Sequence, residues 1–218
     1  MKVFKAFEPS WDFDGFEPYI SEQAMFVHWA NLHSKYVKNL NDMCKKYPEL
    51  VDFDAVDVLK NPSSYFKSED DKMYYLNNMG GHFCHTMFWY CISPNGTKGN
   101  SGIFEALGTT RRSLEQQLKD QGLKRFGSGW SWLSINTKGA LDCYSTQNHF
   151  TPFMRLHDPI LCLDLWEHAY YLDYLGDRAK WLDTILRFVD WNQVFNIWKE
   201  LHYDNTNIIG SMLTAEYD

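Results

Sequence analysis

A polar linker divides this chain into two halves with different patterns, and that division limits the folds it can adopt. The linker reads Asn-Gly-Thr-Lys-Gly-Asn-Ser over 95–101, and we place a domain boundary there, between residues 1–95 and 96–218. Before the linker, apolar residues recur at helical spacing over about 21–45 and 69–92. After it, helical runs are mixed with short strand-like segments. These two patterns predict an α+β protein with a helical N-terminal domain and a mixed C-terminal domain.

The N-terminal half is expected to contain two long helices and one short one. Ser21 is typical of the N-cap of the first long helix, and Pro48 follows its end. A short helix is expected over 50–61. Gly80-Gly81 lies inside the second long helix, at a cost of roughly 1 kcal/mol per glycine relative to alanine. Such a cost indicates close packing or the approach of a ligand.

The C-terminal half is expected to contain three strands and several helices. Strand-like runs cover 129–135, 140–144 and 159–163, and the first two are joined by the hairpin signal Asn-Thr-Lys-Gly. Helices are expected over about 103–121, 166–175, 179–189 and 192–202. Residues 1–18 predict an extended arm, and a tail follows from about 203 to 218.

Composition excludes several classes of protein. A net charge of −7 argues against non-specific nucleic-acid binding, so we expect no nucleic-acid partner. No run of 18 apolar residues exists, so no membrane span is expected. Five cysteines without a CxxC pair predict free thiols in a reducing, intracellular compartment, either the cytoplasm or the mitochondrial matrix. The N-terminus has no recognisable leader, although a processed chain would also lack one.

The strongest chemical signal is the segment Asp164-Leu165-Trp166-Glu167-His168-Ala169-Tyr170-Tyr171. It places a carboxylate and an imidazole four residues apart, and metals bound through nitrogen and oxygen use these two ligand types. The spacing lets both side chains reach one centre, and the aromatic residues would keep that centre dry. An isolated Asp-x-x-x-His pair is usually a solvated surface pair. The whole string therefore indicates a metal site more strongly than the pair does.

This string resembles the Asp-x-Trp-Glu-His-Ala-Tyr-Tyr hallmark of the iron/manganese superoxide dismutases. Two more segments are similar to that family: His28 follows Met-Phe-Val, with Tyr36 eight residues later, and His85 ends Gly-Gly-His-Phe-Cys-His. The resemblance covers roughly 7–198. It implies an α-helical hairpin domain, then an α/β domain with a three-stranded antiparallel sheet. It also implies metal ligation by His28, His85, Asp164 and His168.

Ordinary packing is the alternative for each histidine. A lone histidine on a mixed helix face binds metal in roughly one case in ten. His33, His82, His157 and His202 fit that account, although His33 and His82 lie near the ligand segments and could support them. The metal hypothesis depends on all four predicted ligands, which occur in the family's order and each in its own sequence context.

The resemblance implies a superoxide dismutase, in which one iron or manganese ion cycles between +3 and +2 while superoxide is converted to oxygen and hydrogen peroxide. It assigns Tyr36 as a gateway beside the substrate channel, and Arg178 as a basic residue that guides anions near the channel mouth. It assigns Glu167 a contact with His168 of the partner subunit, across a dimer interface that Tyr171 joins. An aromatic wall would be formed by Trp89, Trp130 and Trp166, although large aromatics more often serve only the core.

The identity of the metal depends on the residue that contacts metal-bound solvent. Gly81 stands where iron types usually supply a Gln, and Asn148-His149 matches the dipeptide in which manganese types supply one. His149 can donate a hydrogen bond as Gln does, and it can also titrate. We place iron slightly ahead of manganese as the cofactor.

Three departures from the family pattern support a rival hypothesis. Leu32 replaces a histidine, Asn31 replaces a lysine, and the tail over 203–218 extends past the usual end. The rival is a non-catalytic superoxide-dismutase-like subunit of a large assembly, such as a mitochondrial ribosome, joined through the tail. The enzyme hypothesis is favoured because all four ligand positions are kept. For the enzyme, we expect a homodimer or a dimer of dimers.

Overall fold

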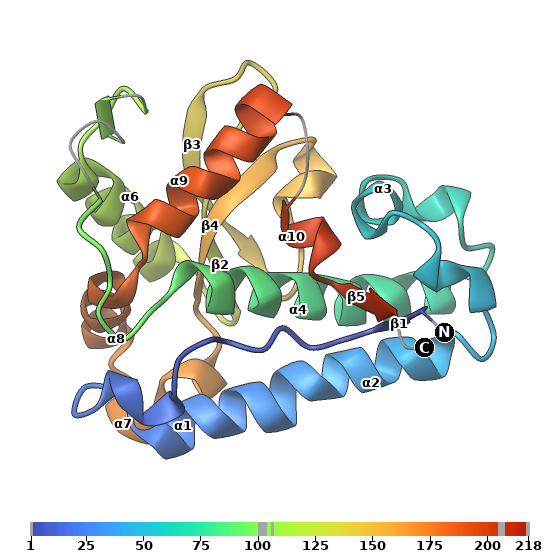
Figure 1. Cartoon of the computed structure of the whole chain (residues 1–218), viewed down its shortest axis with the longest axis horizontal. Coiled ribbons are helices and arrows are strands. Elements are labelled where there is room, and N and C mark those ends of the chain that lie inside the picture. Colours follow the sequence, from blue (N-terminus) through green and yellow to red (C-terminus); the bar gives the residue numbers. More distant parts are fainter. Residues whose placement is uncertain (1, 100–103, 106, 205–207, 217–218) are drawn as a thin grey trace.

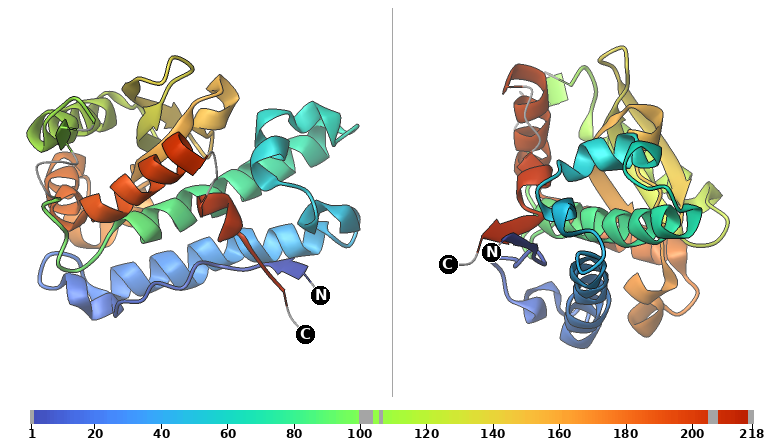
Figure 2. Two further views of the ribbon diagram at one scale, coloured as in Figure 1. Left: turned by 45° about the horizontal axis from the view of Figure 1, so that its top comes forward. Right: turned by 90° about the vertical axis from the view of Figure 1, so that its right-hand side faces the viewer.

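The computed structural model describes residues 2–99, 104–105, 107–204 and 208–216. The long helix α4 crosses the middle of the molecule, with the first helices on one side and a three-stranded sheet on the other (Figures 1 and 2). This α+β architecture confirms the predicted fold class. It brings the two halves of the chain together along α4.

The N-terminal half forms a helical hairpin. Its first arm consists of α1 (Glu22–Val27), the π-helical segment η2 (His28–His33) and α2 (Ser34–Met43). The predicted cap is present, because the Ser21 hydroxyl accepts a hydrogen bond from the Ala24 N–H at 3.2 Å. The return arm is α4 (Glu69–Cys91). A π-helical segment inside an α-helix is often found at a functional site, and η2 carries His28.

The connection between the two arms is made of short helices. The predicted helix over 50–61 is replaced by η3 (Pro48–Val51) and α3 (Ala55–Lys60), followed by η4 (Pro62–Ser64). The break between η3 and α3 occurs where Asp54 caps α3 by accepting from the N–H groups of Val56 and Asp57. A cap of this kind starts a new helix and does not continue the preceding one.

Gly80 and Gly81 allow α4 to pass very close to its neighbours. A Cβ at Gly80 would lie 2.2 Å from the backbone oxygen of His149, and one at Gly81 would lie 2.9 Å from the ring of Tyr36. Both positions therefore need the absence of a side chain. The close packing expected from two glycines inside a helix is confirmed.

The sheet has the order β3-β2-β4, and all its neighbours are antiparallel. Its strands are β2 (Gly129–Ile135), β3 (Leu141–Gln147) and β4 (Asp158–Asp164). The predicted strands are present, and β3 extends three residues beyond the expected end. In the register of β2 with β4, Trp130 lies opposite Asp164. The last residue of β4 is thus placed beside the first tryptophan of β2.

Helices of the C-terminal half pack on the sheet and on one another. The longer ones are α6 (Arg111–Lys124), α8 (Arg178–Ile185) and α9 (Trp191–Lys199), capped by the side chains of Thr110, Asp177 and Asp190. The predicted helix over 103–121 is interrupted: residues 104–105 are helical, and α6 begins only after the Thr110 cap. The expected start at 103 and linker residues 100–101 lie outside the described residues. The predicted helix over 166–175 is divided into η6 (Glu167–Ala169) and α7 (Tyr171–Tyr174), and η7 (Leu186–Phe188) follows α8.

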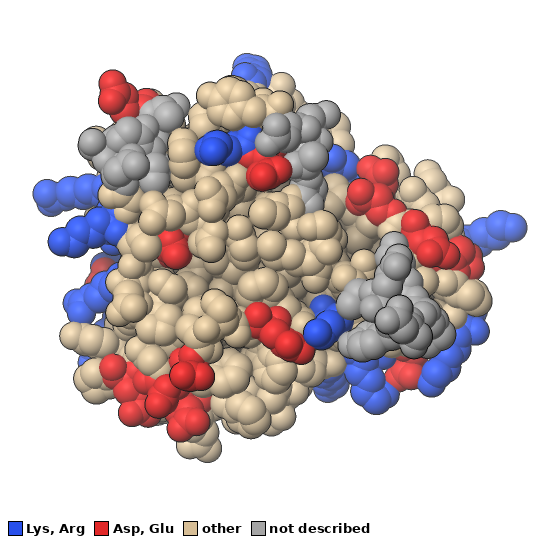
Figure 3. All heavy atoms as spheres, in the orientation of Figure 1, with Lys and Arg blue, Asp and Glu red and all other residues tan. Residues whose placement is uncertain are grey.

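The high aromatic content fills the core between these layers. The largest fully buried side chains include Trp89, Trp130, Trp132, Trp181 and Trp191. All five cysteines are free thiols. Among the described residues, no helix has both the length and the apolar character that a bilayer crossing requires. On the face seen in Figure 3, charged side chains lie mostly around the rim, and the centre is largely uncharged.

The tail returns to the N-terminal arm. After η8 (Glu200–Asp204) come α10 (Ile208–Ser211) and β5 (Thr214–Glu216), which pairs antiparallel with β1 (Lys2–Phe4). The ends of the chain consequently lie close together (Figures 1 and 2). Ile209 and Leu213 are fully buried. The sequence predicted an extended arm at 1–18 but not this pairing.

Candidate metal centre

The side chains of His28, His85, Asp164 and His168 meet between the two halves of the chain. They come from η2, α4, the end of β4 and η6, and one possible ligand atom from each lies within 4.8 Å of all the others. His28, His85 and Asp164 are buried, and His168 is partly exposed. The structure thus brings together the four residues that the sequence predicts as ligands.

Asp164 lies at the centre of this group. Its Oδ2 atom is 3.1 Å from Nε2 of His28, 3.3 Å from Nε2 of His168 and 3.9 Å from Nε2 of His85. Its Oδ1 atom accepts a hydrogen bond from the Trp166 N–H at 2.8 Å. The carboxylate is therefore held in place by its own chain while its second oxygen faces the imidazoles.

Two imidazole nitrogens at this centre are buried without a hydrogen-bond partner. They are Nε2 of His28, whose 3.1 Å contact with Asp164 lacks hydrogen-bond geometry, and Nε2 of His85. The Nδ1 atom of His85 lies 2.6 Å from the Gly81 carbonyl oxygen. Because a carbonyl only accepts, Nδ1 carries the proton and the Nε2 lone pair points into the site. Unpartnered imidazole nitrogens beside a carboxylate fit a bound cation.

Burial and neighbouring ionisable groups together set the charge of the donor groups. It lowers the pKa of His28 and of His85, so both imidazoles are neutral at neutral pH. Burial alone would raise the pKa of Asp164, but His168 and His28 outweigh it and hold that pKa below its usual range. Neutral imidazoles and one carboxylate are the protonation states that metal ligation requires.

His149 connects the site to Tyr36. Trp130 donates its Nε1–H to Nδ1 of His149 at 3.2 Å, and Nε2 of His149 lies 2.7 Å from the Tyr36 hydroxyl. Burial lowers the pKa of His149 to about 4, so the ring is neutral and its single proton lies on Nε2. That proton is donated to Tyr36.

The three predicted wall tryptophans each contact the ring of a candidate ligand. Ring centroids are 4.7 Å apart for Trp89 and His28, 5.1 Å for Trp130 and His85, and 5.5 Å for Trp166 and His168. Trp166 also stacks on His149 at 4.5 Å. These rings enclose the centre with apolar surface.

Comparisons with known proteins agree with this geometry. Residues 4–93 match the alpha-hairpin domain of the iron/manganese superoxide dismutases, and residues 100–197 match the C-terminal domain of the same proteins. A relative from Acinetobacter baylyi, named Superoxide dismutase [Mn], is 36% identical over 194 residues, which cover 84% of this chain and 82% of the relative. The chain belongs to the iron/manganese superoxide dismutase family. It is thus a metal-dependent oxidoreductase.

Three of the residues assigned by resemblance to the superoxide dismutases lie near η6, outside the four-residue cluster. The Glu167 side chain is 53% exposed and accepts a hydrogen bond from the Ser128 hydroxyl at 2.8 Å. Tyr171 is 57% exposed. Arg178 lies 3.6 Å from Glu167 and donates to the carbonyl oxygens of Arg125 and Gly127 at 2.6 and 2.9 Å. Arg178 is therefore occupied in holding the loop before β2.

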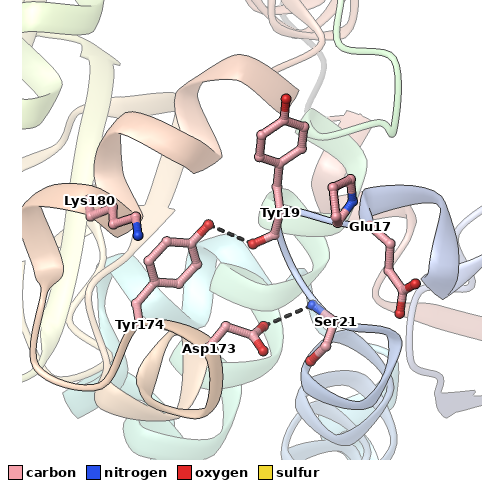
Figure 4. A pocket seen from close by; sticks show the side chains of 7 residues that line it. Glu17, Tyr19, Ser21, Asp173, Tyr174 and Lys180 are labelled. Carbon is pink, nitrogen blue, oxygen red and sulfur yellow. Dashed lines mark hydrogen bonds between the residues drawn. The ribbon is translucent and has the colours of Figure 1, made fainter.

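A surface hollow of about 470 Å³ lies between the segment before α1 and the helices α7 and α8 (Figure 4). Tyr174 donates to the Tyr19 carbonyl at 2.6 Å, and the Ser21 N–H donates to Asp173 at 2.9 Å. None of the residues that line the hollow belongs to the metal cluster. The two hydrogen bonds fasten the start of the first helix to the C-terminal half.

Sequence reasoning missed one set of contacts beside the superoxide dismutase site. It treated His33 and His82 as packing or supporting residues and did not predict that His33 is hydrogen-bonded to His82, or that His82 is hydrogen-bonded to the Leu213 carbonyl oxygen. No local spacing signals this arrangement, because the three residues are far apart in the sequence.

Proposed function

We propose that this chain is a superoxide dismutase that holds one iron or manganese ion through His28, His85, Asp164 and His168. The observation that carries the proposal is the convergence of three imidazoles and a carboxylate, with two buried imidazole nitrogens lacking any other partner. Membership of the family supports superoxide as the substrate. When bound, the ion supplies one-electron chemistry by cycling between +3 and +2, so that superoxide is disproportionated to oxygen and hydrogen peroxide.

The chain's own residues orient the donors and exclude water. The Gly81 carbonyl fixes the His85 tautomer, and the Trp166 N–H fixes Asp164. With the ion bound, three neutral imidazole ligands and one carboxylate would leave a small net positive charge at the site. That charge favours a small anion over a neutral molecule. The wall of Trp89, Trp130 and Trp166 restricts access, so only a small substrate reaches the centre.

Tyr36 is proposed as the proton donor and gateway. Because His149 donates its single proton to the Tyr36 oxygen, the hydroxyl proton of Tyr36 is free to be donated into the site. Burial raises the pKa of Tyr36, so the hydroxyl keeps that proton at neutral pH. His149 would then orient the Tyr36 hydroxyl. To donate a hydrogen bond to solvent in the site as well, His149 would have to share the Nε2 proton that it donates to Tyr36.

The identity of the metal stays open between iron and manganese. The Acinetobacter baylyi relative is named for manganese, so it does not support the preference for iron that the sequence suggested. We propose one ion of either metal per chain.

We further propose a homodimer, alone or paired as a dimer of dimers, in which Glu167 reaches His168 of the partner subunit. Ser128 and Arg178 hold the half-exposed Glu167 at the surface beside His168, and the exposed ring of Tyr171 is available for an interface. Five free cysteines support an intracellular location, in the cytoplasm or the mitochondrial matrix. The rival role as a subunit of a large assembly gains no support from the described part of the tail, which packs on β1.

Metal analysis combined with an activity assay tests the function. The full chain is prepared with iron or manganese supplied, and bound metal and inhibition of superoxide-driven cytochrome c reduction are measured. We expect one ion per chain and activity with at least one metal. His28→Ala should lose both, whereas the matched control His202→Ala, at an exposed histidine, should lose neither. Sub-stoichiometric metal in both preparations of the unchanged chain would refute the proposal.

A further inference from the structure

A second pair of buried histidines lies beside the metal centre but outside its ligand set. His33 on η2 and His82 on α4 are both fully buried, and Nε2 of His33 lies 2.8 Å from Nδ1 of His82. The contacts continue at both ends. Trp89 donates its Nε1–H to Nδ1 of His33 at 3.1 Å, and Nε2 of His82 lies 3.0 Å from the carbonyl oxygen of Leu213. Four groups from three parts of the chain form one row.

The two ends of this row determine the direction of every hydrogen bond in it. The Trp89 indole can only donate, so Nδ1 of His33 accepts and the His33 proton lies on Nε2. That proton is donated to Nδ1 of His82, which places the His82 proton on Nε2. The Leu213 carbonyl can only accept, and it receives this last proton. The hydroxyl of Thr86, 3.4 Å from Nδ1 of His82, can only add a weak second donor there.

We propose that the row Trp89–His33–His82–Leu213 is a one-way hydrogen-bond relay. It couples docking of the C-terminal segment 208–216 to the position of Trp89 and of the metal ligands beside Trp89. His33 and His82 are positioning residues in this scheme. The part that concerns the ligands rests on the proposed function, whereas the relay itself does not.

The packing of the C-terminal segment holds the Leu213 carbonyl oxygen beside His82. The Leu213 oxygen also accepts the Lys5 N–H at 3.1 Å, so both of its lone pairs are used. The side chains of Ile209 and Leu213 are fully buried, and β5 pairs with β1. If the segment undocks, the His82 Nε2–H loses its acceptor inside the protein, which is unfavourable for the whole row.

The other end of the relay touches two of the four candidate ligands. The Trp89 ring lies 4.7 Å from the His28 ring, and the His33 ring stacks on the His85 ring at 5.5 Å and 19°. A change in the position of Trp89 or His33 is therefore passed to His28 and His85 by direct contact. Small displacements of ligands alter how firmly a metal is held.

Two charge substitutions in the tail of the full chain test the relay. Leu213→Asp places a carboxylate at a fully buried position and should undock the segment, whereas Ser211→Asp adds the same charge at an exposed position two residues away. The first readout is exchange of the Trp89 indole N–H with solvent, followed by NMR in the metal-free chain. We expect exchange at least tenfold faster in Leu213→Asp and unchanged in Ser211→Asp.

The second readout is the rate at which a chelator removes manganese from the loaded chain. It should rise severalfold in Leu213→Asp and stay unchanged in Ser211→Asp. A pair of substitutions at His82 tests the same relay if Leu213→Asp does not fold. His82→Leu should accelerate both rates, and His82→Gln should restore them, because its amide accepts from His33 and donates to Leu213.

Defined results would overturn the proposal. Unchanged indole exchange in Leu213→Asp or His82→Leu, or equal acceleration in Ser211→Asp, refutes the relay. Faster indole exchange with an unchanged rate of manganese loss refutes its coupling to the ligands. If the unchanged chain takes up neither metal, the proposed function and the coupling fail together, and indole exchange still decides whether the relay exists.

Discussion

Replacing Gly80 with alanine tests how closely α4 must approach the segment that carries His149. The added Cβ would lie 2.2 Å from the His149 backbone oxygen, whereas ordinary contact begins at 3.4 Å, so helix or segment must move by about 1.2 Å. The obstacle is backbone, and no side-chain rotation relieves it. This movement would change the position of His149 relative to α4 and so disturb the two hydrogen bonds that join His149 to Trp130 and Tyr36.

Two opposing effects decide the change in stability. Helix propensity favours alanine over glycine by about 1 kcal/mol, whereas overpacking a close contact costs about 1–3 kcal/mol. We therefore expect the free energy of unfolding to fall by up to about 2 kcal/mol. Activity should fall further, on the order of a hundredfold, because a displacement on the order of 1 Å at a catalytic group has that effect.

Urea unfolding and the rate of superoxide removal by the metal-loaded chain measure both changes. The matched control is Gly176→Ala, where an added Cβ meets nothing within 4 Å. It should keep full activity and stability. If Gly80→Ala were as stable and as active as the unchanged chain, the proposed dependence of the site on this close approach would be wrong.

Three further predictions follow from other contacts. His149→Gln should keep the fold and shift the redox potential or the metal preference, as measured by electrochemical titration; unchanged potential and activity with both metals would show that His149 does not influence the site. Burial lowers the pKa of His82 to about 4 from 6.5, so the folded chain binds fewer protons than the unfolded chain between these values, and the free energy of unfolding should fall as the pH drops through that window. Urea titrations at pH 7 and pH 4.5 check this, and His82→Gln should lose less stability than the unchanged chain. Glu167→Lys should convert the dimer to monomers in light scattering, and a monomeric unchanged chain would contradict the proposed interface.

Much of the local structure could be predicted because its signals act over a few residues. The Ser21 cap and the helical spacing after it predicted the first arm of the hairpin, and β2 spans the predicted run over 129–135. One boundary was wrong at Thr110, because Gly108 adopts a positive φ after the helical residues 104–105 and the Thr110 side chain then caps a new helix.

The candidate ligands could also be named from the sequence, because each stands in its own local context. His85 ends the segment Gly-Gly-His-Phe-Cys-His, and Asp164 and His168 share one eight-residue string. Only the tertiary structure decided how these groups meet. Asp164 lies at the end of β4 opposite Trp130, and this register depends on pairing between strands that are separated in the chain.

The long-range hydrogen bonds around the site were decided by the tertiary structure. His33 and His82 are 49 positions apart, Tyr36 and His149 are 113 apart, and His82 and Leu213 are 131 apart. A sequence states which groups can donate or accept, but a hydrogen bond requires its two atoms to lie about 3 Å apart in the right direction. The sequence alone therefore determined the two long helices of the hairpin, the three strands of the sheet and the chemistry available. The packing of α4 against η2, the sheet and the tail determined which of those groups became partners.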